Sequence, residues 1–352
     1  MLTTAIVFLV ILSLLVFIHE LGHFVVARLI GVKVEEFGFG LPPRIFGKKI
    51  KGTIYSLNWL PIGGFVRLAG EDDGEAREHA KGKQNLGQYF WARSKKERAA
   101  ILSAGVAMNF LLAVALTTYL LIQGISVPSG RVHIEKVLSG SPAEKAGLKS
   151  GDIIKGFTTP KDLIDRTKAH LGEETTLTII RDGKELSVVL IPRKDSPKGE
   201  GPMGVAISDL EIKKYSMTAA PVEATKINVL RAREMLIGIG QLIVRLVTLK
   251  PLGADVAGPI GIAQVTGQAV KFGLSAVLEF MSILSLNLAV LNVLPIPALD
   301  GGRLLFVFAE KILGRKVAPA FERSTHQIGM IILFILILLV SINDILRLTR
   351  GG

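Results

Sequence analysis

The residues best suited to chemistry form the pentapeptide His-Glu-Leu-Gly-His at 19–23. Side chains four apart share one face of an α-helix, so His19 and His23 can bind one Zn²⁺ through their imidazole nitrogens. Glu20 would then lie beside the metal, where its carboxylate can take a proton from a water molecule. Paired histidines also arise by chance on soluble helices. Here the flanking residues are apolar, and ionisable groups in lipid are costly unless something compensates them, so we predict a metal site.

A catalytic zinc normally has three protein ligands, so the pentapeptide leaves one ligand to be found. The chain has no cysteine, which limits the ligands to His, Asp and Glu and excludes disulfides. Our candidate is Asp300, which follows Pro295 and Pro297 at the end of a late apolar stretch. Prolines break a helix, and a broken helix at membrane depth is tolerated where it lines a cavity. A plain polar turn at the membrane surface is the alternative. Iron or cobalt would accept the same ligands as zinc.

Two asparagines precede Asp300 in the same stretch, Asn287 and Asn292. A buried amide can fix a substrate backbone or an oxyanion, but an intramembrane Asn also serves as a hydrogen-bonding contact between helices. The two are five residues apart and do not share a helix face, so we expect different contacts for each. Both remain candidates for substrate binding.

Four apolar stretches are long enough to span a membrane, at 2–27, 99–124, 274–294 and 327–342. The first lacks the basic start and the small-residue cleavage site of a signal peptide, so we expect it to be retained. Together with a hydrophobic content of 49%, these stretches predict an α-helical polytopic membrane protein with about four transmembrane helices.

The charge distribution predicts the orientation in the lipid bilayer. The chain has 42 Lys+Arg against 30 Asp+Glu, without a basic stripe interleaved with aromatic residues, so nucleic acid is not an expected partner. Residues 28–98 hold 14 Lys+Arg against 8 Asp+Glu, and the loop 301–325 has the same bias. Basic loops stay in the cytoplasm, so we expect 125–273 on the outside.

Segment 52–68 is rich in β-branched and aromatic residues punctuated by Gly and Pro, which favours a hairpin in the cytoplasmic loop. The pattern His-Glu-Leu-Gly-His is the core of a metalloprotease, and a protease that acts on a transmembrane helix must first hold that helix extended, because helical hydrogen bonds shield the peptide bonds. We expect the hairpin to pair with substrate by strand addition, at Ile54 and Tyr55. An ordinary hairpin at the membrane surface is the alternative.

Together these motifs resemble the site-2 protease family of intramembrane metalloproteases, over nearly the whole chain. The pattern is HExxH in the first span and Asn-x-x-Pro-x-Pro-x-Leu-Asp-Gly at 292–301. The stretches Phe-Gly-Phe-Gly-Leu-Pro at 37–42 and Gly-Pro-Ile-Gly-Ile at 258–262 resemble the bacterial branch that contains the regulator of sigma-E protease. The resemblance implies that His19, His23 and Asp300 hold zinc and that Glu20 is the general base. It also implies single-span substrates, namely anti-sigma factors and leftover signal peptides already cut once outside.

Between the second and third spans, residues 125–208 predict a folded, water-exposed domain. The run 141–154, Ser-Pro-Ala-Glu-Lys-Ala-Gly-Leu-Lys-Ser-Gly-Asp-Ile-Ile, resembles the PDZ domain of bacterial envelope proteases. Strands are expected at 175–181 and 185–192, around an Asp-Gly turn. The backbone amides around Met203, Gly204 and Val205 could bind a peptide carboxylate. Alternatively the domain only excludes substrates with a bulky outer domain, which we favour slightly.

The predicted organisation is therefore a membrane core half at 1–124, the PDZ domain at 125–208, an amphipathic connector at 209–273 and a second core half at 274–352. Part of the connector could also dip into lipid. We expect a zinc endopeptidase of the bacterial inner membrane, with its active site toward the cytoplasm and the PDZ domain outside. The alternative from another class is a non-catalytic, PDZ-containing membrane adaptor. The oligomeric state stays open.

Overall fold

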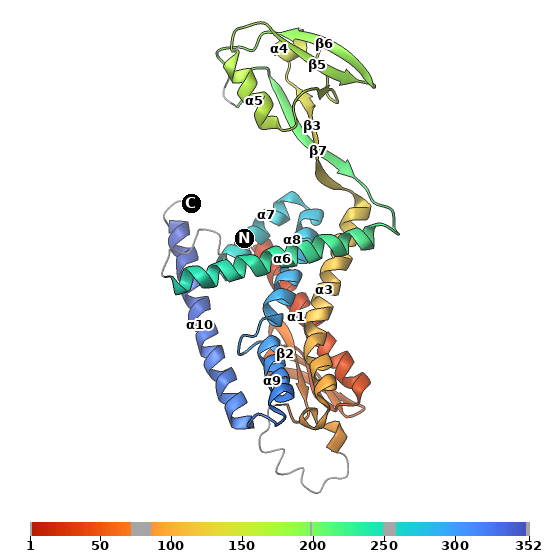
Figure 1. Cartoon of the computed structure of the whole chain (residues 1–352), viewed down its shortest axis with the longest axis vertical. Coiled ribbons are helices and arrows are strands. Elements are labelled where there is room, and N and C mark those ends of the chain that lie inside the picture. Colours follow the sequence, from red (N-terminus) through yellow and green to blue (C-terminus); the bar gives the residue numbers. More distant parts are fainter. Residues whose placement is uncertain (1, 72–85, 198, 249–257, 350–352) are drawn as a thin grey trace. The chain divides into compact units, whose positions relative to one another are not determined.

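The computed structural model describes residues 2–71, 86–197, 199–248 and 258–349 (Figure 1). Parts of the loop that we predicted to be cytoplasmic (72–85) and of the predicted connector (249–257) therefore lie outside the described residues. The chain forms two compact units. One consists of Met1–Leu120 and Met217–Gly352, and the other is the inserted segment Leu121–Ser216.

In the described residues, four helices of the first unit are long and apolar enough to cross a membrane. They are α1 (Leu2–Ile30), α3 (Lys95–Gln123), α8 (Leu274–Val293) and α10 (Pro319–Thr349). Each contains or closely matches one predicted span, and they fit a polytopic membrane protein. Helices α3 and α10 begin earlier than predicted, because Lys, Arg and Glu before the apolar part are good helix formers.

Short polar side chains join α3 to α8. The hydroxyls of Thr117 and Ser282 lie 2.9 Å apart, and Ser282 also donates to the carbonyl of Ala113 at 3.0 Å. Ser285 donates to the carbonyl of Asn109 at 2.8 Å. Small residues let the two helices approach, and hydrogen bonds between helices stabilise such an interface in lipid. The middle of α3 is thus fixed against α8.

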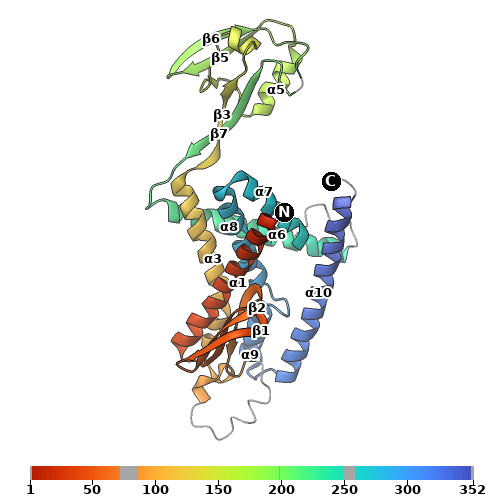
Figure 2. The ribbon, with the colours of Figure 1, turned by 180° about the vertical axis from the view of Figure 1, so that it is seen from behind.

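The remaining helices of the first unit surround this bundle. They are the 3₁₀ turns η1 (Leu86–Gln88) and η2 (Phe90–Ala92), and helices α6 (Ala220–Val247), α7 (Pro259–Phe272) and α9 (Asp300–Leu313). Figures 1 and 2 show α6 running crosswise to α1, α3 and α8. The carboxylate of Asp344 in α10 accepts the backbone N–H groups of Gly258 and Gly261 at 3.3 and 2.9 Å, which caps the start of α7.

Two long strands, β1 (Val34–Ile50) and β2 (Thr53–Leu68), form a sheet against α1, seen in Figure 2. They meet at Lys51 and Gly52, both with positive φ (47° and 87°), as a tight hairpin turn requires. The predicted hairpin at 52–68 is therefore only the second arm of a longer one. Each strand also folds back on its partner, so Phe37 pairs with both Val66 and Tyr55.

The sheet thus consists of four runs in the order 64–68, 34–41, 53–60 and 44–50. Residues 34–40 are mostly buried, because this run lies inside the sheet. Its continuous burial explains why the sequence shows no alternating pattern there, so that the first arm of the hairpin was missed.

The second unit contains a five-stranded sheet in the order β6-β5-β4-β3-β7. Its strands are β3 (Ile125–Val137), β4 (Ile153–Ile154), β5 (Thr175–Arg181), β6 (Lys184–Leu190) and β7 (Val205–Lys213), with helices α4 (Pro142–Lys145) and α5 (Pro160–Ala169). Its own apolar core includes Ile134, Leu163 and Ile179, all 1% exposed or less. The expected strands around Asp182 and Gly183 are present as β5 and β6.

Candidate metal centre

Helix α1 presents His19 and His23 on one face, and both side chains are buried. Nε2 of His19 and Nε2 of His23 lie 3.2 Å apart. Oδ2 of Asp300 lies 2.9 Å from the first and 3.3 Å from the second. The structure thus brings the three predicted ligands together, although Asp300 is far away in sequence.

The chain between α8 and α9 places Asp300 at this point. Helix α8 ends at Val293, shortly before the prolines, and α9 begins with Asp300. A Cβ on Gly301 would lie 2.5 Å from the carbonyl oxygen of Val293, so only glycine lets α9 start so close to the end of α8. In addition, the N–H of Ala298, at a φ of 81°, donates to Nδ1 of His326 in α10 at 3.0 Å.

The residues present fit a zinc ion. Oδ2 of Asp300 is buried and lies within 3.3 Å of Nε2 of both histidines, so three atoms that can each give a lone pair to a metal face one another. Two imidazole nitrogens and one carboxylate oxygen, all within 4.8 Å of one another, are a ligand set that leaves a fourth position open. This supports a ligand role for Asp300 rather than a plain polar turn.

Residues of helix α3 contact both histidines. Nδ1 of His23 donates to the carbonyl of Ile101 at 2.8 Å, so neutral His23 keeps Nε2 for the metal. Gly105 lies against both rings, and a Cβ at this position would overlap Nε2 of His23. Asn109 lies 3.4 Å from Nδ1 of His19. The sequence analysis did not identify Ile101, Gly105 or Asn109. The one pattern that could have indicated them is a Gly and an Asn four residues apart in an apolar span.

Glu20 lies between the cluster and the sheet. Its Oε2 accepts the backbone N–H of Val66 in β2 at 3.0 Å. Val66 belongs to the edge run 64–68, whose partner on the other side is the run 34–41. A donor on the outer side of this edge therefore points at Glu20.

Ile54 and Tyr55 do not lie at this edge. Tyr55 pairs with Phe37 on one side and with Lys48 on the other, and Ile54 likewise has two partners. Strand addition at these two residues would require displacing existing strands, which differs from the expectation.

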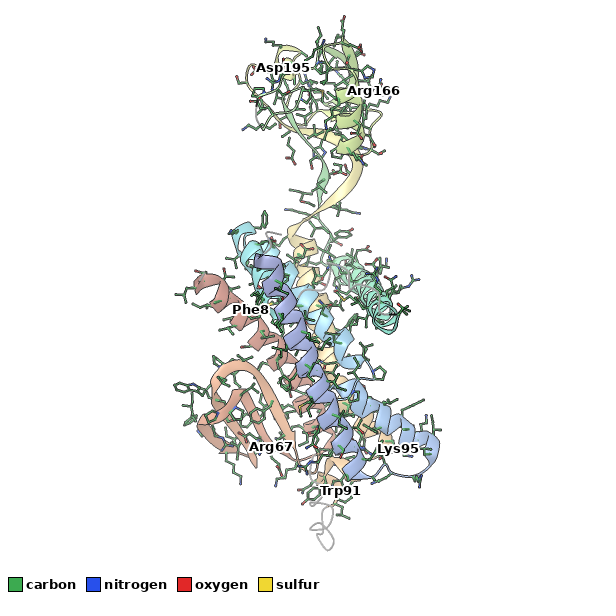
Figure 3. The ribbon with its side chains drawn as sticks, turned by 90° about the vertical axis from the view of Figure 1, so that its left-hand side faces the viewer. Phe8, Arg67, Trp91, Lys95, Arg166 and Asp195 are labelled. Atoms are coloured by element: carbon green, nitrogen blue, oxygen red, sulfur yellow. The ribbon has the colours of Figure 1, made fainter. Side chains whose placement is uncertain are left out.

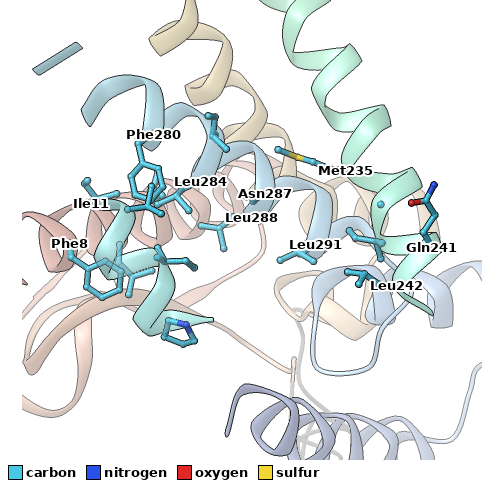
Figure 4. Close-up of a pocket in the computed structure, with 18 of the residues that line it drawn as sticks. Phe8, Ile11, Met235, Gln241, Leu242, Phe280, Leu284, Asn287, Leu288 and Leu291 are labelled. Atoms are coloured by element: carbon cyan, nitrogen blue, oxygen red, sulfur yellow. The ribbon is translucent and has the colours of Figure 1, made fainter. Parts of the chain in front are cut away.

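The two asparagines of the late span occupy different places. Asn287 lines an apolar cavity of about 760 Å³ between α1, α6, α7 and α8, together with residues such as Ile11, Met235 and Leu284 (Figure 4). Asn292 lies half-buried in the last turn of α8, one residue before the helix ends at Val293.

Met203, Gly204 and Val205 belong to the second unit, where their backbone is largely engaged. The N–H of Gly204 donates to the carbonyl of Gly201 at 3.0 Å, and Val205 pairs with Val137 in the sheet. Met203 is buried in the core. The Gly204 amide is thus not available for a peptide carboxylate.

Comparison with known proteins identifies the family. The sequence pattern described as Peptidase family M50 matches residues 7–336. The chain is 34% identical over 339 residues to a Clostridium acetobutylicum protein provisionally named a zinc metalloprotease, covering 95% of this chain and 94% of that protein. It is 30% identical over 424 residues to the regulator of sigma-W protease RasP of Bacillus subtilis, covering 98% and 99%. A zinc metalloprotease RasP of Geobacillus kaustophilus is 30% identical over 416 residues, with 96% of each covered. This chain belongs to peptidase family M50, the site-2 protease family, as its motifs predicted.

Proposed function

We propose that this chain is an intramembrane zinc endopeptidase that cleaves the transmembrane segments of single-span membrane proteins. Membership of a metallopeptidase family and relatives named zinc metalloproteases already make it a membrane metalloprotease that uses Zn²⁺. The observation that carries the proposal is that His19 and His23, on a helix of membrane-spanning length, meet Asp300 at the start of α9, with Glu20 next to the two histidines.

Each residue then has a chemical role. His19, His23 and Asp300 hold the metal, which when bound supplies Lewis-acid activation of water and of a substrate carbonyl. Glu20 accepts the proton of the attacking water and can return it to the leaving amine. Asn292, in the last turn of α8, is our candidate donor for the oxyanion. Asn287, which lines the apolar cavity, is our candidate contact for another part of the substrate.

The substrate strand binds, in our proposal, at the edge run 64–68 rather than at Ile54 and Tyr55. A strand added there would lie between the sheet and Glu20, so its backbone would pass beside the metal centre. The N–H of Val66, which Glu20 accepts in the free protein, is the donor that such a strand would take over. Hence substrate binding would also release the carboxylate of Glu20 for its role as base.

The substrate class and the location follow from the family resemblance and the charge pattern. We infer anti-sigma factors or remnant signal peptides as substrates, consistent with the relative named a regulator of sigma-W protease. We place the chain in a bacterial inner membrane with its basic loops in the cytoplasm. Figure 3 shows Arg67, Trp91 and Lys95 near the same end of the first unit, as expected for one membrane surface. We assign the second unit to a PDZ domain that filters substrates on the outside.

The deciding experiment co-expresses a tagged single-span reporter substrate with the wild type and with Glu20→Gln, and measures zinc in both purified proteins. We expect cleavage to fall by about 10²- to 10⁴-fold with zinc retained, because Glu20 is the base and not a ligand. As a matched ligand variant, Asp300→Ala should lose both zinc and cleavage. Unchanged cleavage in Glu20→Gln, or no zinc in the wild type, would instead favour the non-catalytic adaptor.

A further inference from the structure

Asn109 is the most deeply buried polar side chain next to the metal centre, and the chemistry above does not use it. It is 0% exposed and lies in the middle of α3, a helix of membrane-spanning length. Its backbone carbonyl is held by Ser285 of α8. Its side-chain amide faces Nδ1 of His19 at 3.4 Å. A buried amide in an apolar span is costly, so this contact requires a physical reason.

The orientation of the amide supplies one. In the structure Nδ2 of Asn109 faces His19, while Oδ1 is buried without a hydrogen-bond partner among the described residues. The two ends of an Asn amide have the same shape and are assigned from their hydrogen bonds. Turning the amide by 180° places the oxygen on His19, where it can accept a hydrogen bond from a ring that carries its proton on Nδ1.

This turned amide determines the proton position on His19. An amide oxygen can only accept, so Nδ1 of His19 must carry the proton and Nε2 keeps its lone pair. Nε2 is the atom 2.9 Å from Asp300 and 3.2 Å from Nε2 of His23. With Nδ2 of Asn109 toward His19 instead, Nδ2 would donate to Nδ1, and the neutral ring would carry its proton on Nε2, where a metal could not bind.

We propose that Asn109 is a positioning residue whose side-chain oxygen accepts Nδ1–H of His19 and thereby holds Nε2 toward the zinc. This inference rests on the metal site proposed above. The role of Asn109 toward His19 matches that of the Ile101 carbonyl toward His23. Ile101, Gly105 and Asn109 are four residues apart along α3 and so share one face. One face of α3 therefore orients both histidines, and Gly105 leaves room for their rings.

The test measures zinc affinity of the full-length protein by competition with a chelator, for the wild type, Asn109→Leu and Asn109→Asp. Removing such an outer partner typically weakens metal binding by roughly 10–100-fold, which we expect for Asn109→Leu. Asn109→Asp keeps an acceptor on His19 and should bind zinc as the wild type does. Cleavage by Asn109→Leu should fail at limiting zinc and return at saturating zinc, which a general packing defect would not show.

Asn228 provides the matched control. It is also 0% exposed, lies in α6 and donates to Thr117 and Ala224, away from the metal centre. Asn228→Leu should lower the Tm while leaving the zinc affinity unchanged. The inference is overturned if Asn109→Leu binds zinc as tightly as the wild type, or if Asn109→Asp binds as weakly as Asn109→Leu. A wild type that takes up no zinc would overturn both this inference and the proposed function.

Discussion

Glycine at position 105 decides how closely α3 can approach the two histidines. A Cβ there would overlap Nε2 of His23 and lie 2.6 Å from Cε1 of His19. Alanine in place of glycine normally stabilises a helix by about 1 kcal/mol. At Gly105 we expect the reverse, because the rings or α3 must shift, and zinc binding should weaken as the ligand geometry is lost. Thermal unfolding and chelator competition measure the two effects.

Gly240 offers the control for this substitution. It lies in the helix α6, and a Cβ there would meet no atom within 4 Å in the described parts of the chain. Gly240→Ala should therefore raise or maintain the Tm and leave zinc binding unchanged. Equal zinc binding by Gly105→Ala and Gly240→Ala would contradict the close packing described for α3.

Asp152 and Arg181 form a buried contact in the second unit. The Asp152 side chain is 1% exposed and receives two hydrogen bonds from Arg181, both at 2.6 Å. Burial raises the pKa of Asp152, but the hydrogen bonds from Arg181 and from the backbone of Lys149 outweigh it and hold the pKa below its usual value. A lowered pKa in the folded state means that the carboxylate stabilises the fold above its ordinary pKa of about 4 and loses this effect as pH falls through the lower value.

We therefore expect Asp152→Asn to destabilise the second unit by about 1–3 kcal/mol at pH 7, with the difference from wild type shrinking below pH 4. Hydrogen exchange in the β3 to β7 sheet of the full-length protein, followed from pH 7 to pH 3, measures this. The exposed pair Lys155 and Glu185 is the control, since Glu185→Gln should change stability by about 0–1 kcal/mol. A pH-independent difference would rule out the assigned role of the carboxylate.

The metal ligands could be predicted from residue types, but their supporting residues could not. His19, Glu20 and His23 are linked by local helix spacing, and the prolines before Asp300 mark a broken helix. Ile101 supports His23 through a backbone carbonyl, which carries no side-chain signal at all. Asn109 and Gly105 contact the histidines only because α1 and α3 pack together, and no local sequence pattern predicts that packing.

At the scale of the elements, a deeply buried ion pair joins α3 to α9. Arg98 in α3 and Glu310 in α9 lie 2.7 Å apart, with side chains 4% and 2% exposed. Glu310 also accepts the N–H of Val317 at 3.2 Å, and Lys95 donates to its carbonyl. Since α9 begins with Asp300, this pair fixes the helix that supplies the third ligand to the helix that supports the first two.

Removing one partner of a buried pair leaves the other charge uncompensated, at a cost of about 3–5 kcal/mol. We therefore expect Glu310→Gln to lower the free energy of unfolding by about this amount and to weaken zinc retention through a looser α9. Glu223→Gln in the exposed pair with Lys226 is the control and should change neither quantity. Thermal unfolding and zinc determination on the same samples measure both effects. A Glu310→Gln variant that lost stability but kept its zinc affinity would contradict the proposed link.

The spans were the most predictable elements because length and hydropathy alone identify them. The sheet was the least predictable. Its run 34–41 is paired on both sides and buried, so its sequence lacks the alternation of a half-exposed strand. For the same reason Ile54 and Tyr55 seemed available for substrate, whereas the pairing puts the run 64–68 at the edge near Glu20.

At the scale of the whole molecule, the inserted unit is an independent addition to the membrane core. It has its own apolar core, and its first and last strands pair along their length, from Ile125 with Lys213 to Val137 with Val205. The N–H of Tyr215 donates to the carbonyl of Leu121 at 3.0 Å, so the chain enters and leaves the unit at neighbouring points. A short linker can therefore replace residues 122–214 without separating the two halves of the core.

This deletion separates the two roles considered for the second unit. If the unit is a size filter, the deletion variant should retain zinc, cut a single-span reporter without an outer domain as the wild type does, and newly cut a reporter whose folded outer domain is intact. If the unit must bind the peptide end of the substrate, cleavage of the short reporter should fall while zinc is retained. Because Gly204 already uses its N–H within the fold, we expect the first outcome. Measuring zinc content beside both cleavage rates separates either outcome from a collapse of the membrane core.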